Sequence, residues 1–137
     1  MNELADREQE QHHNSACLRL RTGPLAAGVL GRVVSMMLAR AECPLDRLDD
    51  ALLVCDALCA HAPPHVSDGY LVCTVTVRDG AITLSVSELS PSGASGLVAD
   101  AVVPGVGNLL ERVTDQLRVE PDPEHGGQRL ELVVNFA

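Results

Sequence analysis

Strands are expected wherever apolar and polar residues alternate along this chain, because successive side chains of a strand point to opposite faces. The runs with this pattern are 17–21, 70–77, 81–88, a short stretch near 118–120, and 128–136. Asp79-Gly80 joins the second and third runs, and this dipeptide is typical of a two-residue hairpin turn. The alternation also places Ile82, Leu84, Val86 and Glu88 on one face of the third run.

Helices are expected where apolar residues recur three or four positions apart. The first covers 25–41, the second runs from Pro44 to the Pro63–Pro64 pair, and the third starts at Leu109. Their predicted core-facing residues are Leu25, Val29, Val33, Met36 and Met37, then Leu45, Leu48, Leu52, Cys55 and Cys59, then Leu109, Leu110, Val113 and Leu117. The Ser, Pro and Gly content of 89–96 predicts a loop.

The order of elements is therefore strand, helix, helix, strand, strand, helix, strand, strand. Alternating strands leave one face of a sheet for the core, so the helices should gather on that face. The predicted fold class is α+β, a two-layer sandwich of a mostly antiparallel sheet with helices on one face. Residues 1–15 are polar and lack periodicity, which predicts a disordered tail before a single domain over 16–137.

Composition excludes several kinds of site. All ten basic residues are Arg, so neither a P-loop lysine nor a Schiff-base lysine is available. The formal net charge of −9 repels nucleic acid, and Tyr70 and Phe136 are the only aromatic residues on which a base could stack. The absence of Lys and the abundance of Ala, Val and Arg indicate a GC-rich bacterial genome. Nucleic acid is therefore not an expected partner.

The five cysteines have neither the even number nor the spacing of a disulfide framework. The sequence also lacks a basic-then-apolar leader and an apolar run of about 20 residues. These features predict a soluble, cytoplasmic protein that does not bind membranes.

The element order, with glycines before the third helix and before the last strand, resembles the ATP-binding domain of histidine kinases, the Hsp90 chaperone and anti-sigma serine kinases. The run Leu45–Cys59 is most similar to the anti-sigma group, and the resemblance covers roughly residues 17–136. It implies a degenerate histidine-kinase-like ATPase fold, serine/threonine kinase-like if active. It also implies a homodimer, with a sigma factor and an antagonist protein as partners in partner switching.

The resemblance assigns candidate residues on the second helix. Asp56 takes the position of the family's catalytic general base, where a Glu is usual. Ala60 takes the position of the Asn that ligates magnesium, and it offers no oxygen to that cation, so magnesium binding is in doubt. Asp56 also lies seven residues after Asp49, so the alternative is that it only extends a solvated helix face.

Cofactor-binding positions are assigned in the same way. Glu88 corresponds to the adenine-reading Asp, although Ser90 and Ser92 replace the glycines that usually follow it. Gly105 and Gly107 match the second glycine box, which binds phosphate, and Gly126 and Gly127 match the third. Plain turns explain both glycine pairs equally well, and a solvated strand end explains Glu88.

The leading hypothesis is an anti-sigma-type regulatory protein with weak ATP or ADP binding. The first alternative is a protein-interaction module that kept the fold and lost nucleotide binding. A second alternative is a structural domain supported by zinc on Cys55, Cys59, His61 and His65, but cysteines on an apolar helix stripe are more often core residues, so no metal ligand is assigned.

Overall fold

The computed structural model describes residues 14–137. The predicted tail falls almost entirely on residues 1–13, outside this range, and Ser15 already belongs to the first strand. The elements are β1 (Ser15–Arg21), α2 (Ala26–Arg40), α3 (Leu45–His61), the 3-10 turn η1 (Pro63–His65), β2 (Tyr70–Arg78), β3 (Ala81–Ser87), α4 (Gly93–Asp100), β4 (Val102–Val103), β5 (Gly107–Asn108), α5 (Leu109–Val113), β6 (Gln116–Pro121) and β7 (Gln128–Asn135).

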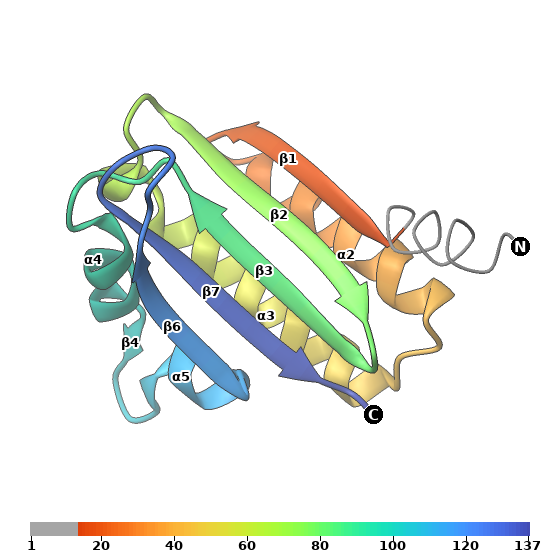
Figure 1. Cartoon of the computed structure of the whole chain (residues 1–137). Coiled ribbons are helices and arrows are strands. Elements are labelled where there is room, and N and C mark those ends of the chain that lie inside the picture. The colour runs from red at the N-terminus through yellow and green to blue at the C-terminus, as the bar shows by residue number, and fades with distance from the viewer. Residues whose placement is uncertain (1–13) are drawn as a thin grey trace, which may run out of the picture.

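Five strands form one antiparallel sheet in the order β1-β2-β3-β7-β6 (Figure 1). The hairpin predicted at Asp79-Gly80 joins β2 to β3, with Arg78 paired to Ala81. Both turn residues have positive φ, 52° and 73°, as a tight two-residue turn requires. β1 and β6 are the two edges of the sheet.

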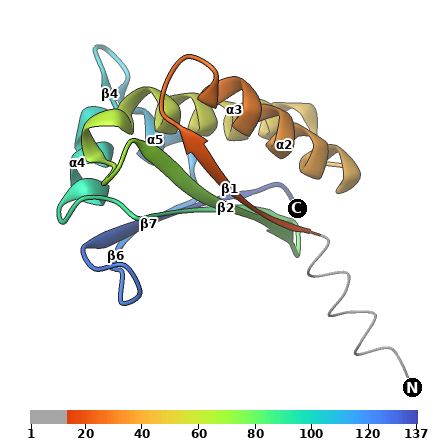
Figure 2. The ribbon, with the colours of Figure 1, turned by 90° about the horizontal axis from the view of Figure 1, so that it is seen from above.

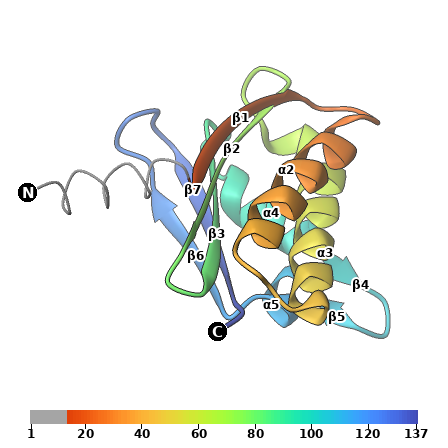
Figure 3. The ribbon, with the colours of Figure 1, turned by 90° about the vertical axis from the view of Figure 1, so that its right-hand side faces the viewer.

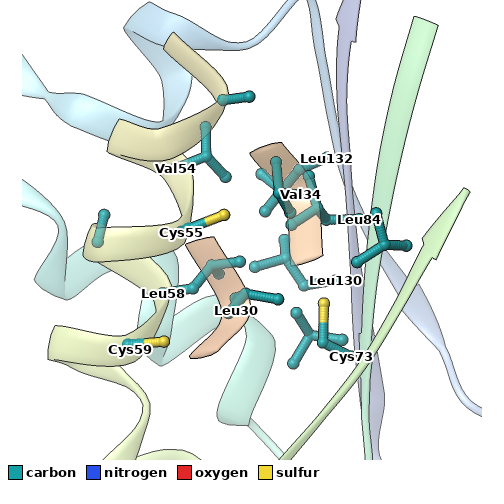
Figure 4. Packing of buried hydrophobic residues seen from close by; sticks show 14 of the residues in the cluster. Leu30, Val34, Val54, Cys55, Leu58, Cys59, Cys73, Leu84, Leu130 and Leu132 are labelled. Atoms are coloured by element: carbon teal, nitrogen blue, oxygen red, sulfur yellow. The ribbon is translucent and has the colours of Figure 1, made fainter. Parts of the chain in front are cut away.

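The helices cover one face of this sheet, which confirms the predicted two-layer α+β sandwich (Figures 2 and 3). The core lies between the layers and is aliphatic: Leu30 of α2 and Leu58 of α3 pack toward Leu84 and Leu130 of the sheet (Figure 4). The opposite face of the sheet carries mostly Ser, Thr and charged side chains. No helix within residues 14–137 has the length and hydropathy to span a bilayer.

The predicted core stripe of α2 is largely wrong. Leu25, Val29 and Met36 have 79%, 44% and 56% of their surface exposed. Met37 is buried as predicted and Val33 packs partly buried against the core, but the other buried residues of this helix are Ala26, Leu30, Val34 and Leu38. Apolar residues surround most of this helix, so spacing alone could not decide which of two parallel stripes is buried.

The stripe predicted for α3 is half right. Cys55 and Cys59 are buried as expected, whereas Leu45 is 72% exposed and Leu48 and Leu52 are half-buried. The buried face is completed by the small residues Ala51 and Ala57 together with Val54 and Leu58. Small side chains allow α3 to lie close to the sheet, a contribution that hydropathy alone understates.

The segment between β3 and β6 differs most from the prediction. The expected loop over 89–96 contains the start of α4, and the β4–β5 hairpin was not expected at all. The third predicted helix ends at Val113, and Leu117 belongs to β6. Thr114 ends α5 with an extended ψ of 151°, so the apolar spacing from Leu109 to Leu117 crosses from helix to strand.

Candidate functional site

Glu88, the residue predicted to read adenine, directly follows β3. Its φ of 55° is in the left-handed region, so the chain turns after Ser87 and Glu88 does not continue the buried face of the strand. Its carbonyl accepts hydrogen bonds from the backbone N (3.3 Å) and Oγ (3.0 Å) of Ser67. Glu88 lines a hollow of about 230 Å³ with Ser67, Asp68 and His125. Two carboxylates and one imidazole there favour a hydrogen-bond donor over a phosphate.

Gly126 and Gly127 lie in the β6–β7 turn, at the same end of the sheet as Glu88. Their φ values are 73° and 69°. A Cβ on Gly127 would lie only 3.1 Å from Pro91 Cα and 3.3 Å from the carbonyl oxygen of Ser90. Glycine therefore lets this turn approach the segment that follows Glu88, so the structure brings these two predicted elements together.

Asp122 organises the same turn and was missed at the sequence level. Its buried carboxylate accepts hydrogen bonds from the backbone N of Glu124 (3.1 Å) and from the backbone N and ring Nδ1 of His125 (3.2 and 3.1 Å). Burial alone would raise the pKa of Asp122, but these bonds favour the carboxylate and hold its pKa below the ordinary value. The signal was present in the sequence, since an Asp at the start of a Pro- and Gly-containing turn commonly binds backbone N–H groups.

Gly105 and Gly107 lie in and beside the β4–β5 turn, with φ values of 81° and 96°. The helix that follows them has only five residues, and its first turn is already occupied: Asn108 Oδ1 accepts from the backbone N of Glu111 at 3.1 Å. The carboxylate of Glu111 in that turn opposes binding of a second anion. This hairpin projects from the helix layer (Figure 2) and exposes Val102, Val103 and Val106.

Asp56 and Ala60 are both exposed on α3. Of the predicted site residues, Gly127 contacts the segment that follows Glu88. Asp56 lies on α3 and Gly105 in the β4–β5 turn, and both are exposed. Asp56 is thus solvent-exposed on α3, and its role as a general base stays a prediction.

Three buried thiols face the core from α3 and β2 (Figure 4). Burial raises the pKa of Cys59 to about 11 and that of Cys73 to about 12, and it raises the pKa of Cys55 as well, so all three are neutral thiols at neutral pH. Within residues 14–137, no group of three or more His, Cys, Asp or Glu side chains is placed to hold a metal ion.

The α4 helix closes over the segment after Glu88. Its Ala94 and Leu97 are fully buried, and the ring of His65 in η1 packs against Gly96. His65 Nε2 is 2.6 Å from Asp100 Oδ2. Ala94, Leu97 and Ala101 have the helical spacing that could have revealed this element, but the Ser, Pro and Gly content of 89–96 obscured it.

Comparison with solved structures identifies this fold in other proteins. A chain in the crystal structure of the SiaB–SiaC complex from Pseudomonas aeruginosa superposes with a TM-score of 0.61 over 98% of both chains, at 12% identity. The structure of the RsbU and RsbW domains of Rv1364c from Mycobacterium tuberculosis matches 88% of this chain with a TM-score of 0.62, at 15% identity. The match spans 31% of that longer chain. No protein-family model and no curated protein matches the sequence.

Proposed function

We propose that this protein is a regulator of the anti-sigma type that acts by partner switching, binding a sigma factor in one state and an antagonist protein in the other. The observation that carries the proposal is the fold shared over 98% of both chains with a chain of the SiaB–SiaC complex, a structure of two proteins bound to each other. The RsbW-containing neighbour supports the same assignment. A chain of this size and fold can act by occupying a surface of its partner, with no chemical step required.

The test uses the purified full chain and the individually purified sigma factors and candidate antagonists of the source bacterium. Biolayer interferometry should detect one sigma factor that binds with a Kd in or below the micromolar range, and an antagonist should displace it. An unrelated acidic protein of similar size serves as the control. If neither class of protein binds, the regulatory proposal is wrong.

Nucleotide binding is a separate question, and three observations favour a module in which it is weak or lost. Ala60 supplies no oxygen for magnesium, which phosphoryl transfer needs to neutralise charge. The first turn of α5 is occupied by Asn108 and Glu111. The α4 helix is packed through Leu97 and Gly96 where a loop rich in Ser, Pro and Gly was expected. We therefore expect ATP or ADP to bind weakly, with little help from magnesium.

Thermal melts with ATP or ADP, with and without magnesium, test this expectation. With a Kd of ~1 mM, ~5 mM nucleotide would stabilise the fold by about 1 kcal/mol, which raises Tm by roughly 3–5 °C. Glu88→Gln should abolish the shift if Glu88 reads adenine. Glu42→Gln is its matched control, because Glu42 is also a glutamate at positive φ, 57°. Tight binding that requires magnesium would contradict our interpretation of Ala60.

A further inference from the structure

We propose that the exposed face of α2 binds an acidic, amphipathic segment of a protein partner. We define the α2 face by Arg21, Leu25, Gly28, Val29, Arg32 and Met36, all of which are exposed. The inference deepens the proposed function and rests on it for the partner's identity, but the surface itself is argued from exposure, shape and charge.

The α2 face has the geometry of a helix-binding surface. Leu25, Val29, Arg32 and Met36 are four, three and four positions apart, so they form one stripe of about 16 Å along the helix. Three of the four are apolar, and they are 79%, 44% and 56% exposed. An amphipathic helix that binds a surface of this kind places its own apolar side chains at the same spacing.

Two hollows beside Leu25 give the α2 face depth. The first, of about 230 Å³, is lined by Leu25, Gly28, Val29 and Arg32. Gly28 contributes no side chain to it, and a Cβ placed there would meet nothing within 4 Å. The second, of about 150 Å³, is lined by Arg21, Leu25 and the three residues between them. Each can receive an apolar side chain from a partner.

Charge indicates the nature of that partner. Residues 14–41 contain four arginines and no carboxylate, so all 19 acidic residues of this chain lie elsewhere. Arg19 is paired with Asp68 at 2.8 Å, whereas within residues 14–137 no carboxylate pairs with Arg21 or Arg32. The first turn of α2 also has no acidic residue to balance the positive end of the helix dipole. The α2 face is thus a basic, apolar surface on a protein of net charge −9, and acidic side chains complement it.

The same charges argue against other occupants. A second copy binding through the α2 face would place the arginines of both copies in one interface to which neither face contributes a carboxylate, and like charges oppose that contact. Nucleic acid and anionic membranes are large and negatively charged, so the net negative charge of the whole protein would repel them more than the few arginines of the α2 face attract them. A protein segment can be acidic where it meets the α2 face and need not be anionic elsewhere.

Residues 1–13 are the competing occupant within this chain, since they carry four acidic residues and one Arg. Their apolar side chains are confined to Met1, Leu4 and Ala5, which do not reproduce the spacing of Leu25, Val29 and Met36. The partner's segment is therefore the better fit, and truncation to residues 14–137 separates the two occupants.

The probe is a synthetic helical peptide of about 18 residues, with Leu spaced four, three and four positions apart and Glu at the flanking positions. A second peptide with Lys in place of every Glu is its control. Fluorescence anisotropy should show that the full chain binds the acidic peptide at least about tenfold more tightly than the basic one. Equal binding of the two peptides, or no binding, would overturn the proposal.

Two variants locate the binding. Arg32→Glu should weaken binding of the acidic peptide about tenfold or more, whereas Arg118→Glu, an exposed arginine of β6, should not. At Gly28 an added Cβ would meet nothing within 4 Å, so Gly28→Leu places a side chain at the larger hollow and should weaken binding while leaving Tm unchanged or raised. If peptide binding survives both changes, the peptide binds another surface and the proposal is wrong. If the 14–137 variant binds more than about tenfold more tightly than the full chain, residues 1–13 are the occupant of the α2 face and the proposal is also wrong.

The proposed function is tested separately, by measuring how the sigma factors and antagonists named above bind the wild type and Arg32→Glu. If such a protein binds the wild type and Arg32→Glu equally well, the regulatory function stands and the α2 face is the wrong surface. If none of them binds but the acidic peptide does, the surface stands and the assignment of its partner is wrong.

Discussion

Replacing Gly96 by alanine tests whether α4 is held closed against η1. Alanine is more favourable than glycine inside a helix by about 1 kcal/mol, so the change should stabilise a helix with open space around it. At Gly96, however, an added Cβ would lie 2.5 Å from His65 Cε1 and 2.8 Å from His65 Nδ1. The ring cannot move freely, because it bonds Asp100 at 2.6 Å and the His65 backbone bonds Ala62 and Ser90.

Two costs therefore oppose the gain in helix propensity. Overpacking a filled site costs about 1–3 kcal/mol. Displacing the His65 ring also loses its hydrogen bond to Asp100, which contributes about 0.5–1.5 kcal/mol. The net loss is about 0.5–3.5 kcal/mol, and Tm should fall by roughly 2–17 °C for a domain of this size.

Thermal unfolding followed by circular dichroism measures this change. Gly28→Ala is the matched control, since it adds the same methyl group to a helix with nothing within 4 Å, and it should raise Tm. In a His65→Ala background the obstacle is gone, so Gly96→Ala should no longer destabilise. If Gly96→Ala raises Tm in the wild-type background, α4 does not pack against His65 as described.

Three further predictions concern titration, thiols and metal. The pKa of Asp122 is lowered in the fold, so its carboxylate stabilises the protein above the unfolded pKa of about 4, and this stabilisation is lost as the pH falls below that value. The difference in Tm between wild type and Asp122→Asn should therefore shrink from pH 6 to pH 3. A difference that stays constant would refute this. Iodoacetamide should alkylate the exposed Cys17 in the native protein and reach Cys55, Cys59 and Cys73 only after unfolding, as mass spectrometry can establish. Elemental analysis of purified protein should find no stoichiometric zinc; about one zinc per chain, lost with the fold on chelation, would show a metal site.

Strand positions could be predicted from the sequence because the alternation of apolar and polar residues has a period of two. A shift of one residue would move every apolar side chain from the core face of the sheet to the solvent face, so the pattern specifies which residues are buried. The hairpin at Asp79-Gly80 and the buried row Ile82, Leu84 and Val86 are confirmed for this reason. Helix faces are harder to predict. In α2 the exposed and buried apolar rows differ by one position, and only contact with the sheet distinguishes Val29 from Leu30.

The candidate site was harder to predict than the fold, because glycines and carboxylates serve backbone geometry as well as ligands. Gly127 is explained by its close approach to Pro91, and Glu88 by the turn after β3. Neither explanation tests adenine or phosphate binding, so those roles stay predictions. The α2 face was hidden for a different reason: its leucine, valine and methionine were assigned to the core, and unexpected exposure is visible only in three dimensions.

The position of β1 at the sheet edge has a consequence for the order in which the protein folds. The paired residues of β1 and β2 are 49 to 61 positions apart along the chain, from Arg21–Tyr70 to Ser15–Thr76, with both long helices in between. The β2–β3 and β6–β7 hairpins close short loops and are expected to form early, whereas pairing of β1 with β2 closes a much longer loop at a higher entropic cost and is expected to form later. Once there, it is held by hydrogen bonds along one side only. Amide protons of β1 should therefore exchange with solvent sooner than those of β3, which lies between two strands. On unfolding, β1 should detach from the sheet before the hydrophobic core opens.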